Sequence, residues 1–259
     1  MIHTNLSNRV PIIAVRHFTA AYGDSVILED LSFDIYPGEV FVILGGSGSG
    51  KSTLLKHMIG LYRPLRGSIL IENKDIVTAQ GQQRLDILTR IGVMYQQGAL
   101  FGSMTLLENV RLPLEEYTDL PDDAIDHLAL MKLQLVGLGA AAHKLPDEIS
   151  GGMKKRAAIA RAMALDPPIL FLDEPSAGLD PITSAELDQL ILSLARNLKI
   201  TFVVVTHELP SIETIADRVI MLDKRTRSII AEGKPQELRD RSENPWVRQF
   251  FNREAGVTG

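Results

Sequence analysis

Runs rich in β-branched and other apolar residues dominate the first part of the chain and predict strands. The predicted strands cover residues 12–20, 26–35, 40–44, 67–71 and 91–95. The run 40–44 is apolar at every position, which is typical of a strand buried on both faces of a parallel sheet. Directly after it comes a glycine-rich segment, and then residues 52–60 place apolar side chains at helical spacing. This part of the chain therefore predicts a strand, a glycine loop and a helix in succession.

The pattern becomes helical between residues 105 and 165. Apolar residues recur there at helical spacing, namely Leu106, Val110, Leu114, Ile125, Leu128, Met131 and Leu135. Pro121 suits the start of a helix, and Asp122 and Asp123 suit the positive end of its dipole. We therefore predict a helical lobe that is inserted between two halves of a sheet.

Strands and helices alternate in the rest of the chain. The predicted strands are 169–172, 200–205, 219–222 and 228–231, and the predicted helices are 182–198, 235–241 and 245–252. This alternation predicts an α/β fold with a mostly parallel sheet. We expect one domain over residues 1–259. Residues 1–97 and 166–259 would form its core with an N-terminal antiparallel β subdomain, and residues 98–165 would form a helical subdomain.

The composition argues against several classes of protein. A net charge of −5 makes bulk attraction to nucleic acid or to anionic lipid unfavourable. The absence of cysteine excludes disulfides and thiolate metal sites. Residues 1–10 lack the apolar segment of a secretory signal, and no apolar run approaches the ~20 residues of a membrane-spanning helix. We therefore expect any membrane role to depend on a partner protein.

The glycine-rich segment after strand 40–44 matches the phosphate-binding P-loop pattern, G-x-x-x-x-G-K-[ST]. Its residues are Gly45, Gly46, Ser47, Gly48, Ser49, Gly50, Lys51 and Ser52. Glycine lets backbone N–H groups approach phosphate oxygens without a side-chain clash, and the helix N-terminus adds a partial positive charge. Lys51 supplies a full positive charge, and the Ser52 hydroxyl is a ligand for Mg²⁺. The segment predicts ATP and Mg²⁺ as ligands of a P-loop NTPase (RecA-like) core.

Two carboxylates, Asp173 and Glu174, follow the predicted strand 169–172. In open α/β sheets, ligands bind at the carboxyl ends of the strands. Asp173 would hold Mg²⁺ there as a Walker-B aspartate does, and Glu174 would orient and deprotonate the attacking water. Adjacent acids after a strand are a weak signal alone, so these assignments depend on the P-loop.

A second anion-binding segment opens the predicted helix after residue 150. Ser150 suits the N-cap position, and Gly151 and Gly152 leave backbone N–H groups open to an anion. The cations Lys154–Arg156 are interpreted as a solvated helix face. One chain thus carries two phosphate-binding devices, whereas an ordinary P-loop kinase or GTPase needs only one.

The order of these motifs resembles that of the ABC transporter ATPases. Residues 150–152 resemble the signature motif of that family, residues 176–180 its D-loop, and His207 its switch histidine. Gln96 matches the Q-loop, and Tyr22 stands where family members stack an aromatic ring on adenine. The resemblance implies a homodimer that sandwiches two ATP molecules. Each signature motif would face the γ-phosphate held by the other subunit's P-loop.

The same resemblance implies a role for each matching residue. The catalytic residues would be Glu174, His207, Lys51 and Gln96, and the metal shell would include Ser52, Gln96 and Asp173. The nucleotide contacts would be Tyr22, the P-loop residues 45–52 with Thr53, and the partner-facing residues Ser150, Gly151, Gly152 and Asp180.

Met153 departs from the signature motif, which usually ends in glutamine, and methionine cannot form the hydrogen bonds of an amide. The same departure is found in the Mla-type phospholipid transport ATPases associated with MCE proteins, which residues 97–101, 180–183 and 247–250 also resemble. This resemblance implies a peripheral ATPase on the cytoplasmic face of the bacterial inner membrane, powering phospholipid transport between the inner and outer membranes.

The resemblance also implies partners for the chain. They would be an integral-membrane permease (MlaE-like), an MCE-domain protein (MlaD-like) and a small STAS-domain subunit (MlaB-like), with phospholipid as the transported substrate and no nucleic acid. We expect an apolar groove for a permease helix near Leu100, Phe101 and Met104, just after Gln96.

Three alternatives remain open at this point. The first is an ABC importer ATPase for a polar solute such as an amino acid. The second is a soluble ABC ATPase that acts on ribosomes or DNA, although such proteins usually carry two cassettes, coiled coils or basic extensions that this chain lacks. The third is a small-molecule P-loop kinase, which leaves residues 150–152 and His207 unexplained.

Overall fold

The computed structural model describes residues 9–253, and its larger sheet has six strands. Their order is β10 (Ser228–Gly233), β9 (Arg218–Asp223), β3 (Val40–Gly45), β8 (Thr201–Val205), β7 (Ile169–Asp173) and β6 (Ile91–Met94). All neighbouring pairs are parallel except the edge pair of β10 and β9. The predicted parallel α/β core is therefore confirmed.

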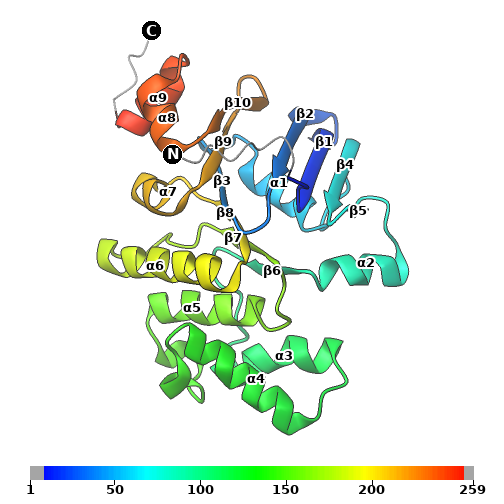
Figure 1. The fold of residues 1–259 in the computed structure, drawn as a ribbon, viewed down its shortest axis with the longest axis vertical. Helices are drawn as coiled ribbons and strands as arrows, with labels where there is room; N and C mark the ends of the chain where they lie inside the picture. The colour runs from blue at the N-terminus through cyan, green and yellow to red at the C-terminus, as the bar shows by residue number, and fades with distance from the viewer. Residues whose placement is uncertain (1–8, 254–259) are drawn as a thin grey trace.

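A smaller antiparallel sheet of four strands lies beside it (Figure 1). Its order is β2 (Ser25–Ile35), β1 (Ile13–Tyr22), β4 (Arg66–Ile71) and β5 (Lys74–Asp75). The turn after Tyr22 joins β1 to β2, as the sequence predicts. This sheet confirms the predicted N-terminal antiparallel β subdomain.

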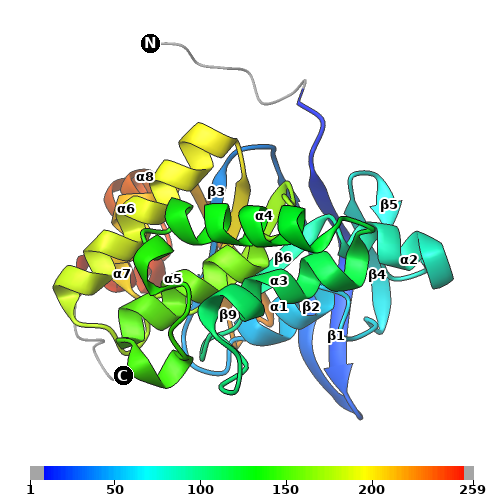
Figure 2. The ribbon, with the colours of Figure 1, turned by 90° about the horizontal axis from the view of Figure 1, so that it is seen from below.

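Helices pack on the larger sheet, and a group of them forms one end of the molecule (Figures 1 and 2). They are α1 (Lys51–Met58), α2 (Gly81–Leu88), α3 (Leu106–Tyr117), α4 (Asp122–Leu135), α5 (Gly151–Ala162), α6 (Pro181–Leu198), α7 (Leu209–Ile215), α8 (Pro235–Arg241) and α9 (Pro245–Asn252). The helices α3, α4 and α5 pack together, and in the sequence they lie between β6 and β7, which are neighbouring strands of the larger sheet. The exact limits of a helical subdomain at residues 98 and 165 stay a prediction. No helix within residues 9–253 is both long and apolar enough to cross a membrane.

Two helices were not predicted from the sequence, α2 and α7. Only Ile87 is buried in α2, so its apolar pattern is too sparse to reveal a helical period. The helix α7 is seven residues long and carries Pro210 in its first turn, so it offers too few positions for a repeating pattern. By contrast, the predicted apolar positions Leu106, Val110 and Leu114 are all buried in α3. This helix also begins with a capping box, in which Thr105 and Glu108 accept hydrogen bonds from each other's backbone N–H groups.

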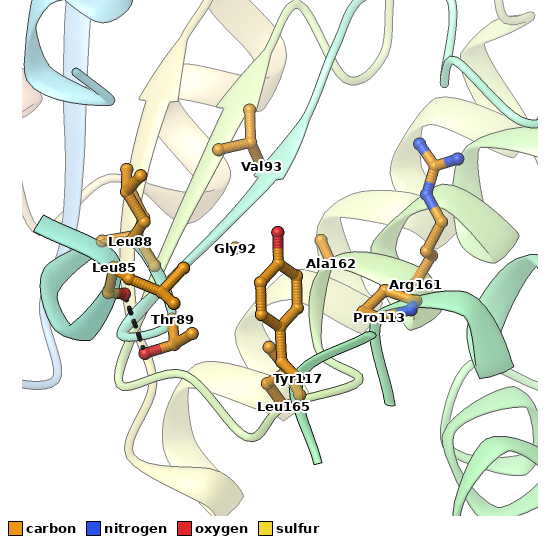
Figure 3. Close-up of a pocket in the computed structure, with 11 residues that line it drawn as sticks. Leu85, Leu88, Thr89, Gly92, Val93, Pro113, Tyr117, Arg161, Ala162 and Leu165 are labelled. Atoms are coloured by element: carbon orange, nitrogen blue, oxygen red, sulfur yellow. Dashed lines mark hydrogen bonds between the residues drawn. The ribbon is translucent and has the colours of Figure 1, made fainter. Parts of the chain in front are cut away.

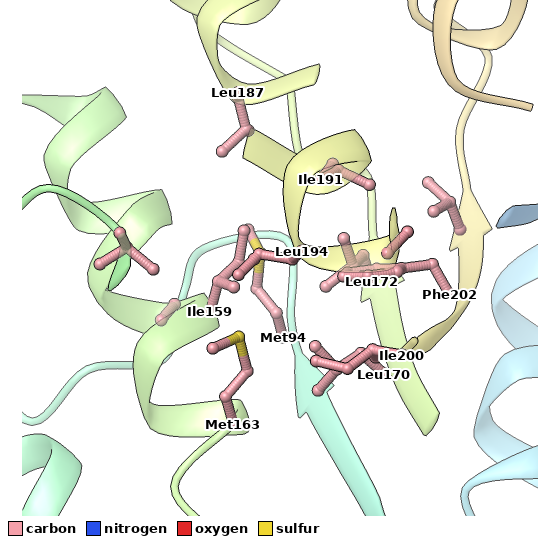
Figure 4. Packing of buried hydrophobic residues seen from close by; sticks show 14 of the residues in the cluster. Met94, Ile159, Met163, Leu170, Leu172, Leu187, Ile191, Leu194, Ile200 and Phe202 are labelled. Atoms are coloured by element: carbon pink, nitrogen blue, oxygen red, sulfur yellow. The ribbon is translucent and has the colours of Figure 1, made fainter. Parts of the chain in front are cut away.

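The larger sheet separates two hydrophobic clusters. In β3, Val40, Val42 and Leu44 face one cluster, and Phe41 and Ile43 face the other. The first cluster packs against α5 and α6, as Figure 4 shows for Ile159, Leu187 and Ile191 around the strand residues Leu170 and Leu172. The second cluster packs against α1 and the smaller sheet. Burial on both faces explains why 40–44 reads as an uninterrupted apolar run.

One buried carboxyl, Asp188, lies between α6 and the neighbouring helix α7. Asp188 is 4% exposed, and its Oδ1 has no hydrogen-bond partner within residues 9–253. Burial raises its pKa from 3.8 to about 6, because the charged form loses its hydration. In the unfolded chain the carboxyl ionises at its ordinary pKa, so folding is less favourable once the pH exceeds both values.

We expect Asp188→Asn to remove this penalty. Stability of the parent protein should decline as the pH rises from about 4 to about 6, because the folded state binds the proton more tightly than the unfolded state. The variant should therefore gain about 1–3 kcal/mol at pH 8 and nothing at pH 4. Urea unfolding at both pH values measures the difference, with the exposed Asp119→Asn as a matched control. An equal gain at both pH values would contradict the titration.

Candidate nucleotide-binding site

The P-loop runs from Gly45, the last residue of β3, to Ser52, the second residue of α1. Gly50 precedes α1 in a left-handed conformation with φ of 96°, and a β-carbon there would lie 2.8 Å from Leu28 Cδ2. A β-carbon on Gly45 would lie 2.5 Å from the backbone oxygen of Leu222. Only glycine fits these two positions. No side chain caps α1, so its first N–H groups are open to an anion.

Lys51 lies across the mouth of this loop. Its Nζ donates hydrogen bonds to the carbonyl oxygens of Gly45 at 2.8 Å and Gly46 at 3.2 Å. Burial lowers the pKa of Lys51, and the negative charges of Glu174 and Asp173 oppose that effect. The ammonium is thus held between the loop and the two carboxylates that the sequence assigns to the same site.

The carboxylates lie at the carboxyl end of β7, as predicted. Asp173 is the last residue of β7 and is paired with Val205 of β8. Glu174 has a positive φ of 47°, which is uncommon for residues other than glycine and is typical of functional sites. Burial and the neighbouring Glu174 raise the pKa of Asp173, while the charges of Lys56, Lys51 and Lys155 lower it.

The donor set at this point fits a hard cation such as Mg²⁺. Asp173 Oδ1 is a buried oxygen that lacks a hydrogen-bond partner in the part of the chain that the structure describes. Such an oxygen is costly unless a ligand satisfies it, and Mg²⁺ prefers oxygen ligands. Within residues 9–253 no group of three or more His, Cys, Asp or Glu side chains could hold a metal ion. A cation here would therefore depend on hydroxyl, amide and phosphate oxygens as well as on Asp173.

His207 meets Glu174 although the two residues are far apart in the sequence. His207 follows β8, the strand beside β7, and its Nδ1 lies 2.8 Å from Glu174 Oε1. When Glu174 is ionised, Nδ1 must be the donor of this hydrogen bond. The other carboxylate oxygen, Oε2, is buried and has no hydrogen-bond partner among the described residues. One oxygen of Glu174 thus contacts His207, and the other is left without a hydrogen-bond donor among the described residues.

The interpretation of Lys154–Arg156 as a solvated face is wrong for Lys155. Its side chain is buried at 8% exposure, and its Nζ donates to the backbone oxygen of Gln96 and, at 3.3 Å, to that of Glu174. Burial lowers the pKa of Lys155, opposed by Asp173 and Glu174. The run of three cations gives no sign of which one turns inward, because that depends on the packing of α5 against β6.

The predicted signature motif and D-loop pack against each other. Ser150 is the N-cap of α5, and its Oγ accepts a hydrogen bond from the Met153 N–H at 3.3 Å. Asp180 is the N-cap of α6 and accepts from the N–H of Thr183 at 3.0 Å. Hydrogen bonds from the Thr183 hydroxyl and from the backbone N–H groups of Thr183 and Ile182 lower the pKa of Asp180. A β-carbon on Gly152 would lie 2.4 Å from Thr183 Cγ2, so this glycine permits the close approach of α5 to α6.

The P-loop and the signature motif belong to opposite faces of the larger sheet. The helix α1 contributes Leu54, Leu55 and Met58 to the cluster on one face, and α5 contributes Ile159 to the cluster on the other. The structure therefore brings together Lys51, Asp173, Glu174 and His207 within one chain. It places Ser150 on a separate helix that packs on the other side of the sheet.

Three residues beside the predicted nucleotide site were not predicted from the sequence, namely Tyr62, Lys224 and Trp246. Tyr22 lies at the end of β1 as an exposed ring, and Tyr62, from the loop after α1, meets it edge to face with ring centroids 6.1 Å apart. A β-carbon on Gly46 would lie 4.0 Å from Cζ2 of Trp246 on α9, and one on Gly48 would lie 3.7 Å from Cδ of Lys224. Each reaches the site through a contact between segments that are not adjacent in the sequence, so no local pattern could reveal it.

An apolar pocket of about 200 Å³ lies between α2, β6, α3 and α5 (Figure 3). It is lined by Leu85, Leu88, Thr89, Ile91, Gly92, Val93, Pro113, Tyr117, Arg161, Ala162 and Leu165. The groove expected near Leu100, Phe101 and Met104 is not this pocket, because Leu100 packs into the core and Met104 lines a more polar hollow. The two regions are joined by Arg161, which lines the pocket and donates to the backbone oxygen of Ala99 at 2.8 Å.

The chain resembles several known proteins over most of its length. It is 46% identical to a probable ribonucleotide transport ATP-binding protein, mkl, of Mycobacterium leprae over 240 residues, covering 93% of this chain and 68% of that protein. It is 38% identical to the intermembrane phospholipid transport system ATP-binding protein MlaF of Haemophilus influenzae, covering 94% of this chain and 91% of that protein. The chain spans about two thirds of the length of other mycobacterial mkl relatives.

Solved structures agree with these relationships. A dimeric ATP-binding cassette, MJ0796, in a post-hydrolysis state with ADP and Pi, superposes with a TM-score of 0.77 at 32% identity, over 86% of this chain and 98% of that one. The cbiO1 subunit of the cbiONQ transporter complex of Clostridium perfringens superposes with a TM-score of 0.82 at 31% identity, over 90% and 92%. The sequence profile of the ABC transporter family matches residues 28–177. Profile, relatives and fold agree, and the chain therefore belongs to the ATPases of the ABC transporter family.

Proposed function

We propose that this chain is the ATP-hydrolysing subunit of a transporter that moves phospholipid between two membranes, working as a homodimer beneath an integral-membrane permease. The observation that carries the ATPase activity is the contact of His207 with one oxygen of Glu174, next to the P-loop, while the other oxygen has no hydrogen-bond partner among the described residues. The phospholipid substrate is supported by the relationship to MlaF over nearly the whole length of both chains. We place the subunit on the cytoplasmic face of the inner membrane.

The residues of the site divide the reaction between them. The open N–H groups of the P-loop and Lys51 would bind the phosphates of ATP. Glu174 Oε2 would accept the proton of the attacking water, and His207 would hold the carboxylate in the orientation that this transfer needs. Ser52, Gln96 and Asp173 would hold Mg²⁺, which supplies charge neutralisation to the transferred phosphate group.

Transport of a polar solute is the second candidate. The mycobacterial relatives named for ribonucleotide transport are more similar in sequence than MlaF, at 46% against 38% identity. We favour the phospholipid system, with MCE-domain and STAS-domain proteins as further partners of the complex, because Met153 and residues 97–101, 180–183 and 247–250 also resemble the Mla-type ATPases.

The apolar pocket beside β6 is the docking site that we propose for a helix of the permease. Its lining is dominated by aliphatic and aromatic carbon, and Tyr117 stands in it, as Figure 3 shows. Arg161 connects this pocket to residues 98 and 99, just after Gln96, through hydrogen bonds of 3.1 and 2.8 Å. A helix that fills the pocket would therefore be linked, through Arg161, to the segment that follows Gln96.

We expect Tyr117→Glu to abolish co-purification of the subunit with a multi-span permease and its phospholipid. The substitution places an unpaired carboxylate in an apolar contact, which costs several kcal/mol when the partner covers it. Because Tyr117 is 49% exposed, the isolated subunit should fold and bind ATP normally. Tyr117→Phe, which keeps the ring, is the matched control. Pull-down from detergent-solubilised membranes, with analysis of the recovered lipid, measures the outcome.

Two results would contradict the proposal. Full recovery of the permease with Tyr117→Glu would remove the pocket from the interface. Recovery of a permease without phospholipid, together with a deletion strain that loses uptake of one polar solute and keeps a normal envelope, would favour the solute transporter instead.

A further inference from the structure

Four aromatic rings form a continuous row from the core of the smaller sheet to the predicted adenine site. Phe18, which is fully buried, meets the ring of His57 edge to face at 5.2 Å between centroids. His57 in turn lies 5.7 Å from the ring of Tyr62. The outermost pair is Tyr62 and Tyr22, whose rings are perpendicular at 88° with centroids 6.1 Å apart.

The two tyrosines at the end of this row are half exposed, whereas the rings beneath them are not. Tyr22 is 48% exposed and Tyr62 is 46% exposed, but His57 is buried at 3%. A half-exposed ring is ordinarily free to change rotamer, and the contact with Tyr62 restricts that freedom for Tyr22. In a perpendicular pair at least one face of Tyr22 stays uncovered by Tyr62, so a base can still stack on it.

The inner end of the row is anchored to the helix whose N-terminus belongs to the P-loop. His57 Nδ1 lies 2.7 Å from the backbone oxygen of Thr53, one turn earlier in α1. Lys56, also in α1, lies over the Tyr62 ring at 5.9 Å from its centroid. His57 and Lys56 therefore hold Tyr62 in place relative to α1, and the Tyr62 ring in turn restricts the ring of Tyr22 on β1.

We propose that Tyr62 is a positioning residue of the nucleotide site, which holds the Tyr22 ring in the orientation that stacks on adenine. This inference rests on the proposed role of Tyr22 in ATP binding. It assigns to Tyr62 no contact with the phosphates. Tyr62 reduces the loss of side-chain conformational entropy when Tyr22 stacks on the base, because the Tyr22 ring is already held before the nucleotide binds.

Calorimetric titration of the full-length protein with ADP and with inorganic pyrophosphate tests the proposal. Tyr62→Ala should weaken ADP binding about 3- to 10-fold, the range expected for loss of one aromatic pair. Pyrophosphate binding should not change, because it has no base. Tyr62→Phe keeps the ring and should bind ADP as the parent does. Leu65→Ala, an exposed apolar residue of the same loop, is the matched control.

A double variant separates a role through Tyr22 from a direct one. If Tyr62 acts by holding Tyr22, then Tyr22→Ala with Tyr62→Ala should bind ADP no worse than Tyr22→Ala alone. Losses that multiply would overturn the proposal, as would equal weakening of ADP and pyrophosphate, or an effect of Tyr22→Ala with none of Tyr62→Ala. In that last case the role of Tyr22 stands and only Tyr62 is excluded. If Tyr22→Ala binds ADP as the parent does, the stacking role and this inference both fail.

Discussion

Replacing Glu174 by glutamine should leave ATP bound and reduce its hydrolysis by about 10²- to 10⁴-fold, the usual contribution of a positioned general base. The amide keeps the shape of the side chain and can still contact His207, but it cannot accept the proton of the attacking water. Affinity for ATP should persist because the groups predicted to hold the phosphates, Lys51 and the N–H groups at the start of α1, are unchanged. The variant should therefore accumulate as an ATP-bound dimer.

Glu208→Gln is the matched control for this experiment. Glu208 is the other carboxylate near His207, with Oε1 at 3.8 Å from Nε2, but its side chain is 46% exposed, whereas that of Glu174 is 12% exposed. Its amide variant should hydrolyse ATP at the parent rate. Phosphate release and size-exclusion chromatography with ATP measure the two effects. Hydrolysis by Glu174→Gln at the parent rate would show that another group accepts the proton.

Most of the fold follows from local patterns in the sequence. The run 40–44 is apolar throughout because β3 is buried on both faces, and this is visible in the sequence alone. The P-loop is equally local, since its glycines satisfy requirements of one short segment. Asp173 and Glu174 could be placed near it because parallel strands end at the same edge of a sheet.

The parts that escaped prediction depend on contacts between distant segments. Lys155 turns inward because α5 packs against β6 and offers it the backbone oxygens of Gln96 and Glu174. Tyr62 and Trp246 reach the site from a loop and from the last helix of the described chain. The apolar pocket beside β6 was not predicted for a similar reason, because α2, which forms one wall, has almost no apolar pattern.

The position of the signature motif leads to the second strong expectation. Because α1 and α5 pack on opposite faces of the larger sheet, we expect Ser150 to serve the nucleotide of a second subunit. The solved relative MJ0796 is dimeric, which supports such a composite site. Lys51→Ala removes the cation at the P-loop, and Ser150→Arg removes an N-cap and fills the anion site with a bulky side chain.

Heterodimers that combine these two substitutions should differ sharply in activity. With Lys51→Ala on one chain and Ser150→Arg on the other, both lesions fall in one composite site and the second site is intact. With both substitutions on one chain, each site carries one lesion. We expect the first heterodimer to hydrolyse about one ATP per dimer in a single turnover, while the second should fall to the level of a Lys51→Ala homodimer. Differently tagged chains, purified in tandem and mixed with labelled ATP, allow this comparison. If the signature served its own chain, the ranking would reverse, because only the heterodimer with both substitutions on one chain would keep an intact site.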